Sequence, residues 1–119
     1  MPSDKSARRL EDIIENAQPI QRYVAGMDVT FKQDQKTYDA VERCLERISE
    51  AAAKMGDLAS ALVPGQPWQE IRALGNRLRH EYDAIREDRL WDIVQIDLPP
   101  LRAACEDALR RLREGQGEA

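Results

Sequence analysis

The stretch YDAVERCLERISEAAAKM, residues 38–55, carries the strongest helical pattern in the chain. Its apolar side chains recur every three or four residues, the spacing that places side chains on one face of an α-helix. Charged residues fill most of the positions between them. The stretch therefore predicts an amphipathic helix that starts around Asp34 and buries one face. The residues expected on that face are Tyr38, Val41, Cys44, Leu45, Ile48, Ala52 and Met55.

The segment before this helix shows the same periodicity. It begins near Ser3 or Ser6, either of which suits a helix N-cap, and Gly26 should end it. Pro19 is expected to kink this helix or divide it near Ala17, because proline removes one helical hydrogen bond. The apolar stripe consists of Leu10, Ile13, Ile14, Ala17, Ile20 and Val24.

Two further helices follow. Residues 27–34 form a polar connector in which Phe31 is expected to plug the edge of the core. The run Pro64-Gly65-Gln66-Pro67 is the surest boundary, and its last proline suits the first turn of a third helix. Asp88 is expected to cap the last helix, which Pro99-Pro100 should bend or interrupt. The third helix carries Trp68, Ile71, Leu74, Leu78 and Ile85, and the last carries Leu90, Trp91, Val94, Leu98, Leu101, Cys105, Leu109 and Leu112.

All four segments have helical spacing, and no alternating strand pattern is visible in the sequence. The chain therefore predicts an all-α fold, an up-and-down bundle of four main helices with the last kinked at Pro99-Pro100. A chain of 119 residues should form one domain over 1–119. We expect order over about 3–113 and a frayed tail at 114–119.

Composition excludes several classes of protein. The net charge of −4 argues against a protein that coats nucleic acid unaided, although a local basic site remains compatible with it. Cys44 and Cys105 fit no metal-ligand spacing and are expected to pack as small core residues, so we expect no metal and no cofactor. The N-terminus has no apolar signal region, and no run is long enough to span a membrane. The chain is expected to be soluble and cytoplasmic.

His80 is the only histidine. On a helical wheel with Ile71 at zero it falls at about 180°, directly opposite the apolar stripe. Arg79 and Arg72 fall at about 80° and 100°, and Asn76 at about 140°. Arg77 lies on the far flank, and Asp83 falls between Arg72 and Asn76 on the near one. Arginines and an amide around one imidazole suit a phosphate oxyanion with a proton to move, because histidine titrates near neutral pH.

Two plainer interpretations stay open at this point. An exposed histidine is often only solvated, and arginines on a helix face often only solubilise it or pair with an acid four residues on, as Arg79 can with Asp83. Tyr82 falls about 20° from Ile71, at the edge of the apolar stripe. Its residue type and place favour a packing role with the hydroxyl reaching water.

The motif around His80 resembles the HepT-like family, the minimal nucleotidyltransferase-associated toxins of the HEPN superfamily. The resemblance spans most of the chain in order and spacing. It rests on Ile13-Ile14, Arg22 to Met27, Asp39-Ala40-Val41, Ser49 to Ala52, Pro67 to Ile71, Asn76 to Tyr82, Leu90-Trp91 and Asp97 to Leu101. It implies a homodimeric helical bundle that acts as a metal-independent endoribonuclease on RNA.

The family signature is an arginine, four to six residues and a histidine, often followed by a variable residue and a tyrosine. His80 and Tyr82 match its second half, and Asn76 matches the polar residue after the arginine. The arginine does not match, because with four intervening residues its place falls on Gly75. The resemblance then leaves Arg79 as the best substitute and Arg72 as the second, with Arg77 and Arg79 as RNA phosphate contacts.

The resemblance also implies a partner, a nucleotidyltransferase antitoxin that adenylylates Tyr82 and blocks the site. The chemistry expected is attack of an RNA 2′-hydroxyl on the adjacent phosphate, with His80 moving protons. One histidine cannot be acid and base at once, so a dimer should bring two His80 side chains across one cleft. Two alternatives remain: a catalytically silent HEPN dimer that binds a nucleotidyltransferase, nucleotide or RNA, favoured by Gly75, and a purely structural helical adaptor.

Overall fold

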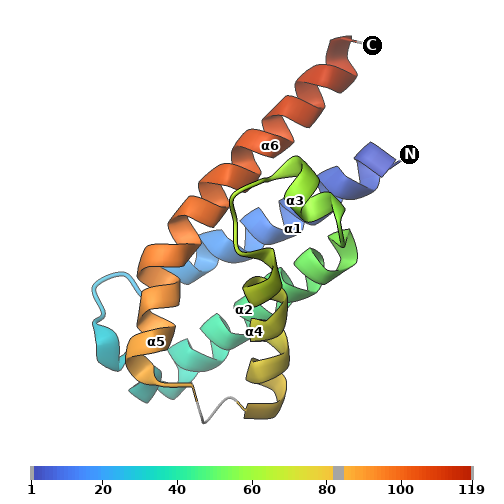
Figure 1. Cartoon of the computed structure of the whole chain (residues 1–119). Helices are drawn as coiled ribbons and strands as arrows, with labels where there is room; N and C mark the ends of the chain where they lie inside the picture. Colours follow the sequence, from blue (N-terminus) through green and yellow to red (C-terminus); the bar gives the residue numbers. More distant parts are fainter. Residues whose placement is uncertain (1, 82–84, 119) are drawn as a thin grey trace.

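The computed structural model describes residues 2–81 and 85–118, which form helices and connecting turns without any β-strand (Figure 1). The prediction of an all-α fold is confirmed. The helices are α1 (Pro2–Tyr23), the 3₁₀-helix η1 (Val29–Gln33), α2 (Gln35–Met55), α3 (Leu58–Leu62), α4 (Trp68–Glu81), α5 (Glu87–Asp92), the π-helix η3 (Ile93–Asp97) and α6 (Leu98–Glu118). None of these helices is long and apolar enough to cross a membrane.

The long helices pack closely against their neighbours in the bundle except between α4 and α6. α1 packs between α2 and α6, and α4 packs against the other side of α2. α5 packs on η1 and continues through η3 into α6, whose C-terminal end projects beyond the other helices (Figure 1). Across the described residues, α4 makes no comparable contact with α6. The side chains of α4 that face away from α2 therefore border a gap between α4 and α6 rather than a closely packed helix.

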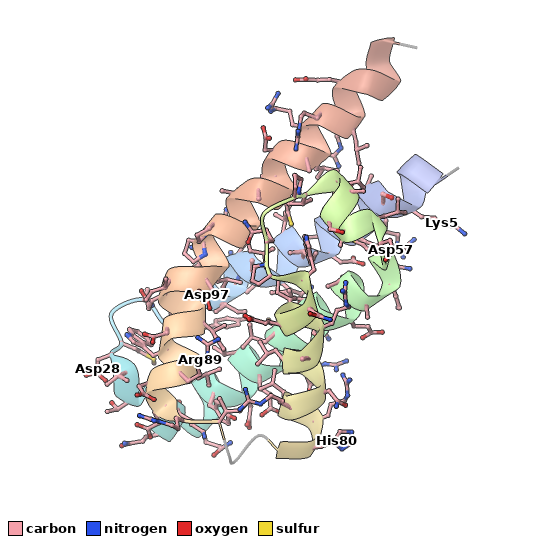
Figure 2. All side chains as sticks on the ribbon, viewed as in Figure 1. Lys5, Asp28, Asp57, His80, Arg89 and Asp97 are labelled. Carbon is pink, nitrogen blue, oxygen red and sulfur yellow. The ribbon has the colours of Figure 1, made fainter. Side chains whose placement is uncertain are left out.

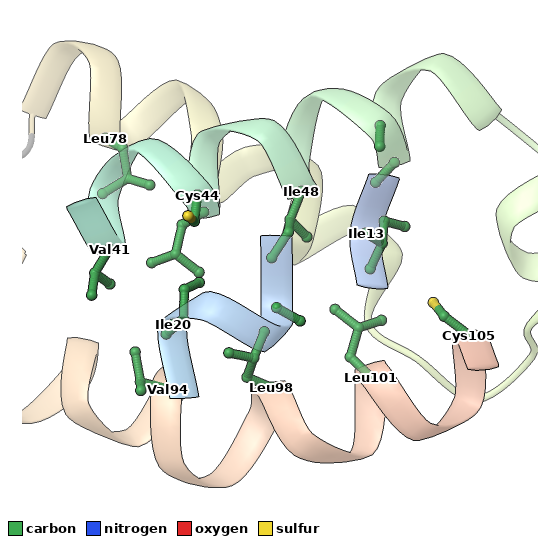
Figure 3. Close-up of a cluster of buried hydrophobic side chains, with 14 of the residues drawn as sticks. Ile13, Ile20, Val41, Cys44, Ile48, Leu78, Val94, Leu98, Leu101 and Cys105 are labelled. Carbon is green, nitrogen blue, oxygen red and sulfur yellow. The ribbon is translucent and has the colours of Figure 1, made fainter. Parts of the chain in front are cut away.

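The core lies where α1, α2 and α6 meet, and Figure 3 shows side chains from all three helices interleaved there. Every predicted apolar residue of α2 is buried, and so is Phe31, which closes one end of the core as expected. Full burial of each large aliphatic side chain, such as Leu10 or Ile13 at 0% exposure, stabilises the fold by roughly 1.5–3 kcal/mol. The helical periodicity of the sequence thus selected the correct faces.

Pro19 does not divide α1, which runs unbroken from Pro2 to Tyr23, because proline removes only one hydrogen bond and Ile20 and Val24 hold the last turn in the core. One expectation about a helix start is wrong. Asp88 is not the N-cap of its helix, since Arg86 occupies that position and Asp88 lies in the first turn. The N-cap of α2 is as expected: the Asp34 side chain accepts a hydrogen bond from the Thr37 N–H at 3.1 Å.

The interruption of the last helix is real, but it lies before the prolines. Residues 93–97 widen into a π-helix, and Pro99 and Pro100 then occupy the first turn of α6. The Leu98 N–H donates a hydrogen bond to the Ile93 carbonyl five residues earlier, so the helix widens directly before the two residues that have no N–H to donate. α6 continues to Glu118, through the segment in which the sequence predicts fraying.

Both cysteines are buried in the core, as expected. Burial raises the pKa of the Cys105 thiol from 9.0 to about 12, because the thiolate loses its hydration, and Glu106 adds to the effect. The unfolded chain therefore loses this proton at a lower pH than the folded chain does. The stability that comes from the neutral thiol is full below about pH 9 and is lost as the pH rises towards 12.

We expect the free energy of unfolding to fall less steeply between about pH 9 and pH 11 in Cys105→Ala than in the original chain. Urea titrations at several pH values measure this slope. Cys44→Ala is the matched control, since burial raises the pKa of that thiol less and the nearby Arg47 and Arg43 oppose the effect. Equal slopes for the original chain and Cys105→Ala would contradict the prediction.

Candidate functional site

A buried hydroxyl fixes α4 on α2. Ser49 of α2 is 3% exposed, and its Oγ donates a hydrogen bond to the Arg72 carbonyl at 2.9 Å. The same Oγ accepts a hydrogen bond from the Gly75 N–H at 3.1 Å. Because both partners are backbone groups of α4, this contact sets the height and the rotation of α4 relative to α2. We call these three groups the Ser49 clasp.

At Gly75 the two helices come too close for a side chain to fit between them. A Cβ atom at position 75 would lie 2.2 Å from Ser49 Oγ and 2.6 Å from Ser49 Cβ, distances that real side chains do not show. The position at which the family signature places an arginine therefore faces the core in this chain. Glycine stands there because only glycine lets the α4 backbone reach the Ser49 hydroxyl.

His80 lies in the last turn of α4, is exposed, and projects from the end of that helix into solvent (Figure 2). Asn76, one turn earlier, is exposed as well. The wheel prediction that His80 points away from the core is confirmed. Among the described residues, no hydrogen bond or ion pair joins His80 to an arginine, so its imidazole is open to solution.

Arg72 and Arg79 lie on the flank of α4 that borders α2. The guanidinium of Arg79 folds back along the helix, and its Nη1 comes within 3.6 Å of where a Cβ of Gly75 would stand. Glu50 of α2 is close to it: the pKa of this carboxyl is lowered by its hydrogen bond and charge contact with Lys54 and further by Arg43 and Arg79. Arg79 therefore holds a guanidinium directly above position 75.

Arg77 lies on the opposite flank of α4, where the bundle is open. There a groove of about 240 Å³ runs between α4 and the α5–η3–α6 column. We call it the α4–α6 groove. Its wall includes Ile71 and Leu74 from α4 and Ile93 from η3, all half-buried. The charged side chains on it are Glu70, Arg77, Arg89 and Asp97, and Arg89 pairs loosely with Asp97 at 3.8 Å.

The predicted site residues thus divide into three groups around α4. Arg72 and Arg79 border α2, Arg77 borders the α4–α6 groove, and Asn76 and His80 lie between them on the exposed face. Tyr82, the expected adenylylation acceptor, lies outside the described residues, and so does Asp83. Within residues 2–81 and 85–118, no three His, Cys, Asp or Glu side chains lie close enough to share a metal ion.

The tryptophans are structural, as the sequence indicates. Trp68 is buried at the start of α4, and its indole N–H donates to the Val63 carbonyl at 2.8 Å. Trp91 is half-buried, with its ring centroid 5.5 Å from that of Phe31. Neither ring is offered as a platform for base stacking.

Comparison with known proteins identifies the family. The profile of the Ribonuclease HepT-like family matches residues 13–108, which include both the Ser49 clasp and His80. The chain belongs to the HepT-like ribonuclease family. The resemblance noted in the sequence is therefore confirmed, and the chain is related to proteins named as ribonucleases.

Two relatives illustrate how much of a HepT-like chain is shared. A Methanocaldococcus jannaschii protein that is provisionally named an RNase is 32% identical over 119 residues, covering 99% of this chain and 98% of its own. A Thermococcus cleftensis protein named Probable ribonuclease HepT is 33% identical over 100 residues, covering 82% of this chain and 89% of its own. No solved structure matches the chain at a comparable level.

The sequence reasoning missed three features of this HepT-like chain. The role of Ser49 was hidden because a serine among alanines on an apolar face carries no signal of its partner. Arg89 was missed because it lies on a different helix from the motif. The α4–α6 groove depends on which helices fail to touch, and periodicity does not report that. The groove shows itself only in the structure, where Ile71 and Leu74 are half-buried although they lie midway along a predicted apolar stripe.

Proposed function

We propose that this protein is a metal-independent endoribonuclease and the toxin of a type VII-like pair with a nucleotidyltransferase antitoxin. The observation that carries the proposal is His80: the only imidazole of a HepT-like chain, exposed to solvent on a helix anchored by the Ser49 clasp. A side chain with no structural task, on a helix whose position is set by a buried hydrogen-bonded contact, is free to act on a ligand.

The proposed reaction is an internal transfer within RNA. The 2′-hydroxyl oxygen attacks the adjacent phosphorus while His80 takes the hydroxyl proton. The bond from phosphorus to the 5′-oxygen breaks, and a protonated imidazole gives that oxygen its proton. The products are a 2′,3′-cyclic phosphate and a 5′-hydroxyl end. No water or metal ion enters the balance of this step.

Arg79 is the proposed source of charge stabilisation, with Arg72 second. The negative charge that develops on the phosphoryl oxygens needs a fixed donor, which the family signature supplies as an arginine. Position 75 cannot hold one, but the Arg79 guanidinium lies above it. Asn76 and Arg77 flank His80 and are proposed to hold the neighbouring phosphates.

A second copy of the chain is proposed to complete the site. One imidazole cannot take and give a proton in the same step, so the partner's His80 would act as the acid. The α4–α6 groove supports a symmetric contact because it combines apolar walls with two acids and two arginines, Glu70, Asp97, Arg77 and Arg89. A two-fold axis places each patch against its own copy, so a patch with both signs of charge can pair its acids with the arginines of the partner.

We expect Leu74→Glu to produce a monomer, because docking would bury the new carboxylate in an apolar groove. The dimer dissociation constant should rise at least about 100-fold, since burying an unpaired charge costs several kcal/mol. Sedimentation equilibrium measures it. Leu58→Glu, on the 44% exposed Leu58 outside the groove, is the matched control. A dimer that survives Leu74→Glu unchanged would place the interface elsewhere.

The antitoxin proposal concerns Tyr82. A nucleotidyltransferase partner would transfer one AMP from ATP to the Tyr82 oxygen and release pyrophosphate, which would add negative charge two residues after His80. Mass spectrometry after incubation with the partner and ATP tests this, with Tyr82→Phe as the control. Modification that persists in Tyr82→Phe would place the acceptor elsewhere.

Cleavage of RNA in EDTA tests the enzymatic proposal directly. The original chain should cut RNA and leave the same sequence untouched as DNA or as 2′-O-methyl RNA, because both lack the attacking hydroxyl. Equal cleavage of the 2′-O-methyl strand would contradict the mechanism. Failure to cleave a range of RNAs, with the dimer intact, would favour the second candidate, a silent dimer that only binds a nucleotidyltransferase or RNA. The specific observation behind that candidate is Gly75 at the arginine position.

A further inference from the structure

A row of cations runs along the exposed face of α2, apart from the His80 motif. It consists of Lys36, Arg43, Arg47 and Lys54, all exposed, and we call it the α2 basic stripe. The spacings of seven, four and seven residues keep these side chains within about 40° of one another on the helix. The stripe extends about 27 Å at 1.5 Å per residue. In an acidic protein, such alignment concentrates positive potential along one line.

One end of the stripe borders a polar depression in the surface. Arg47 and Lys54 meet Arg9 of α1 around a depression of about 210 Å³ between α1 and α2. Arg9 is held by Asp12 at 3.2 Å and Lys54 by Glu50 at 3.1 Å, whereas Arg47 has no ion pair among the described residues. Three cations thus converge on two carboxylates, which leaves an uncompensated positive charge facing the depression.

Cations of the stripe and of the motif on α4 lie close to the same carboxylate. Glu50 is the shared neighbour: Lys54 binds it, and Arg43 and Arg79 lie close enough to lower the pKa of its carboxyl. Glu46 forms an ion pair with Arg43 at 3.4 Å. Glu46 and Glu50 are therefore each paired with a cation of the stripe, which lowers the repulsion that a polyanion would meet between Arg79 and the stripe.

We propose that the α2 basic stripe and the depression beside Arg47 bind the sugar-phosphate backbone of RNA outside the cleaved bond. The inference rests on the proposed ribonuclease function. No aromatic side chain lines the depression or belongs to the stripe, so bases find no stacking surface there. Contacts to phosphates alone carry no sequence information but add affinity and strong salt dependence. The stripe would hold a substrate while the His80 site selects the bond.

Binding of a fluorescent 20-nucleotide RNA to a His80→Ala background tests the proposal, because that background leaves the RNA uncut. We expect Arg47→Ala with Lys54→Ala to weaken binding at least about tenfold at low salt. The slope of log affinity against log salt should become shallower by about 1.4, the loss of two phosphate contacts on a single strand. Arg110→Ala with Arg111→Ala on α6 is the matched control, since it removes the same charge from exposed residues elsewhere.

Equal weakening in the two double variants, or none in either, overturns the proposal. So does loss of nucleotidyltransferase binding with RNA affinity unchanged, which would assign the stripe to a protein partner. Cleavage of a dinucleotide keeps this test separate from the proposed function, because its single internucleotide phosphate is the one cleaved and none is left to contact the stripe. The original chain and Arg47→Ala with Lys54→Ala should cleave it at the same rate. If neither cleaves the dinucleotide or any longer RNA, the ribonuclease proposal fails while the binding result still decides the stripe.

Discussion

Replacing His80 with alanine is expected to lower RNA cleavage at least about 1,000-fold while leaving the fold intact. Proton transfer by a positioned side chain contributes about 100- to 10,000-fold, and in the proposed dimer the substitution removes both the acid and the base. The imidazole is exposed and makes no described hydrogen bond, so its loss should shift the melting temperature little. Cleavage rates in EDTA and thermal melts of the same preparations measure the two effects.

A matched control and a mixing experiment sharpen this test. Gln69→Ala removes another exposed polar side chain from α4, far from the motif, and should cleave like the original chain. Equal cleavage by the original chain and His80→Ala would point to a contaminating nuclease. If each bond needs two imidazoles, dimers reassembled from equal amounts of the two chains should retain about a quarter of the activity. Retention of about half would mean that each copy works alone.

Inserting the arginine of the family signature at position 75 is expected to unfold the helix pair rather than to create activity. Gly75→Arg would force a side chain into space held by Ser49, where even a Cβ comes within 2.2 Å of Oγ. Overpacking of this kind costs about 1–3 kcal/mol for small additions, and an arginine would also break the Ser49 clasp and bury its charge. We expect Gly75→Arg to lose cooperative unfolding or at least about 4 kcal/mol of stability. Urea denaturation followed by circular dichroism measures this loss.

Smaller variants keep this prediction testable if Gly75→Arg fails to fold. Gly75→Ala should destabilise despite the higher helix propensity of alanine, whereas Gly115→Ala in α6, where a Cβ meets nothing within 4 Å, should gain up to about 1 kcal/mol. Combining Gly75→Ala with Ser49→Gly should recover part of the loss, because Ser49 supplies the two closest atoms. A stable, active Gly75→Arg would show that position 75 can face the catalytic side.

The sequence was sufficient for features that depend on local periodicity. The spacing of apolar residues gave the buried faces of α1 and α2, and the wheel placed His80 on the exposed side of α4. The family signature could be aligned as far as its missing arginine. Each of these inferences needs only residues within one helix, where geometry repeats every 3.6 residues.

Features that depend on contact between helices could not be predicted. Nothing in the sequence pairs Ser49 with Gly75, so the glycine looks like a lost arginine until the helices are seen to touch there. Pro19 was expected to kink or divide α1, and the division does not occur because the burial of Ile20 beyond it, which local propensity cannot weigh, holds the helix together. Asp88 looked like a cap because it is a favoured N-cap residue near a helix start, while the tertiary position of α5 sets the actual start at Glu87.

Because α4 packs closely on α2 alone, local unfolding should begin at α4. Helices α1 and α2 are each packed along two neighbours, so their amides should exchange hydrogen only on global unfolding. α4 can detach from α2 by opening one interface, at a fraction of that free energy. Its amides should therefore exchange first among the long helices, and the helix that carries the only histidine is also the one with the greatest freedom to open.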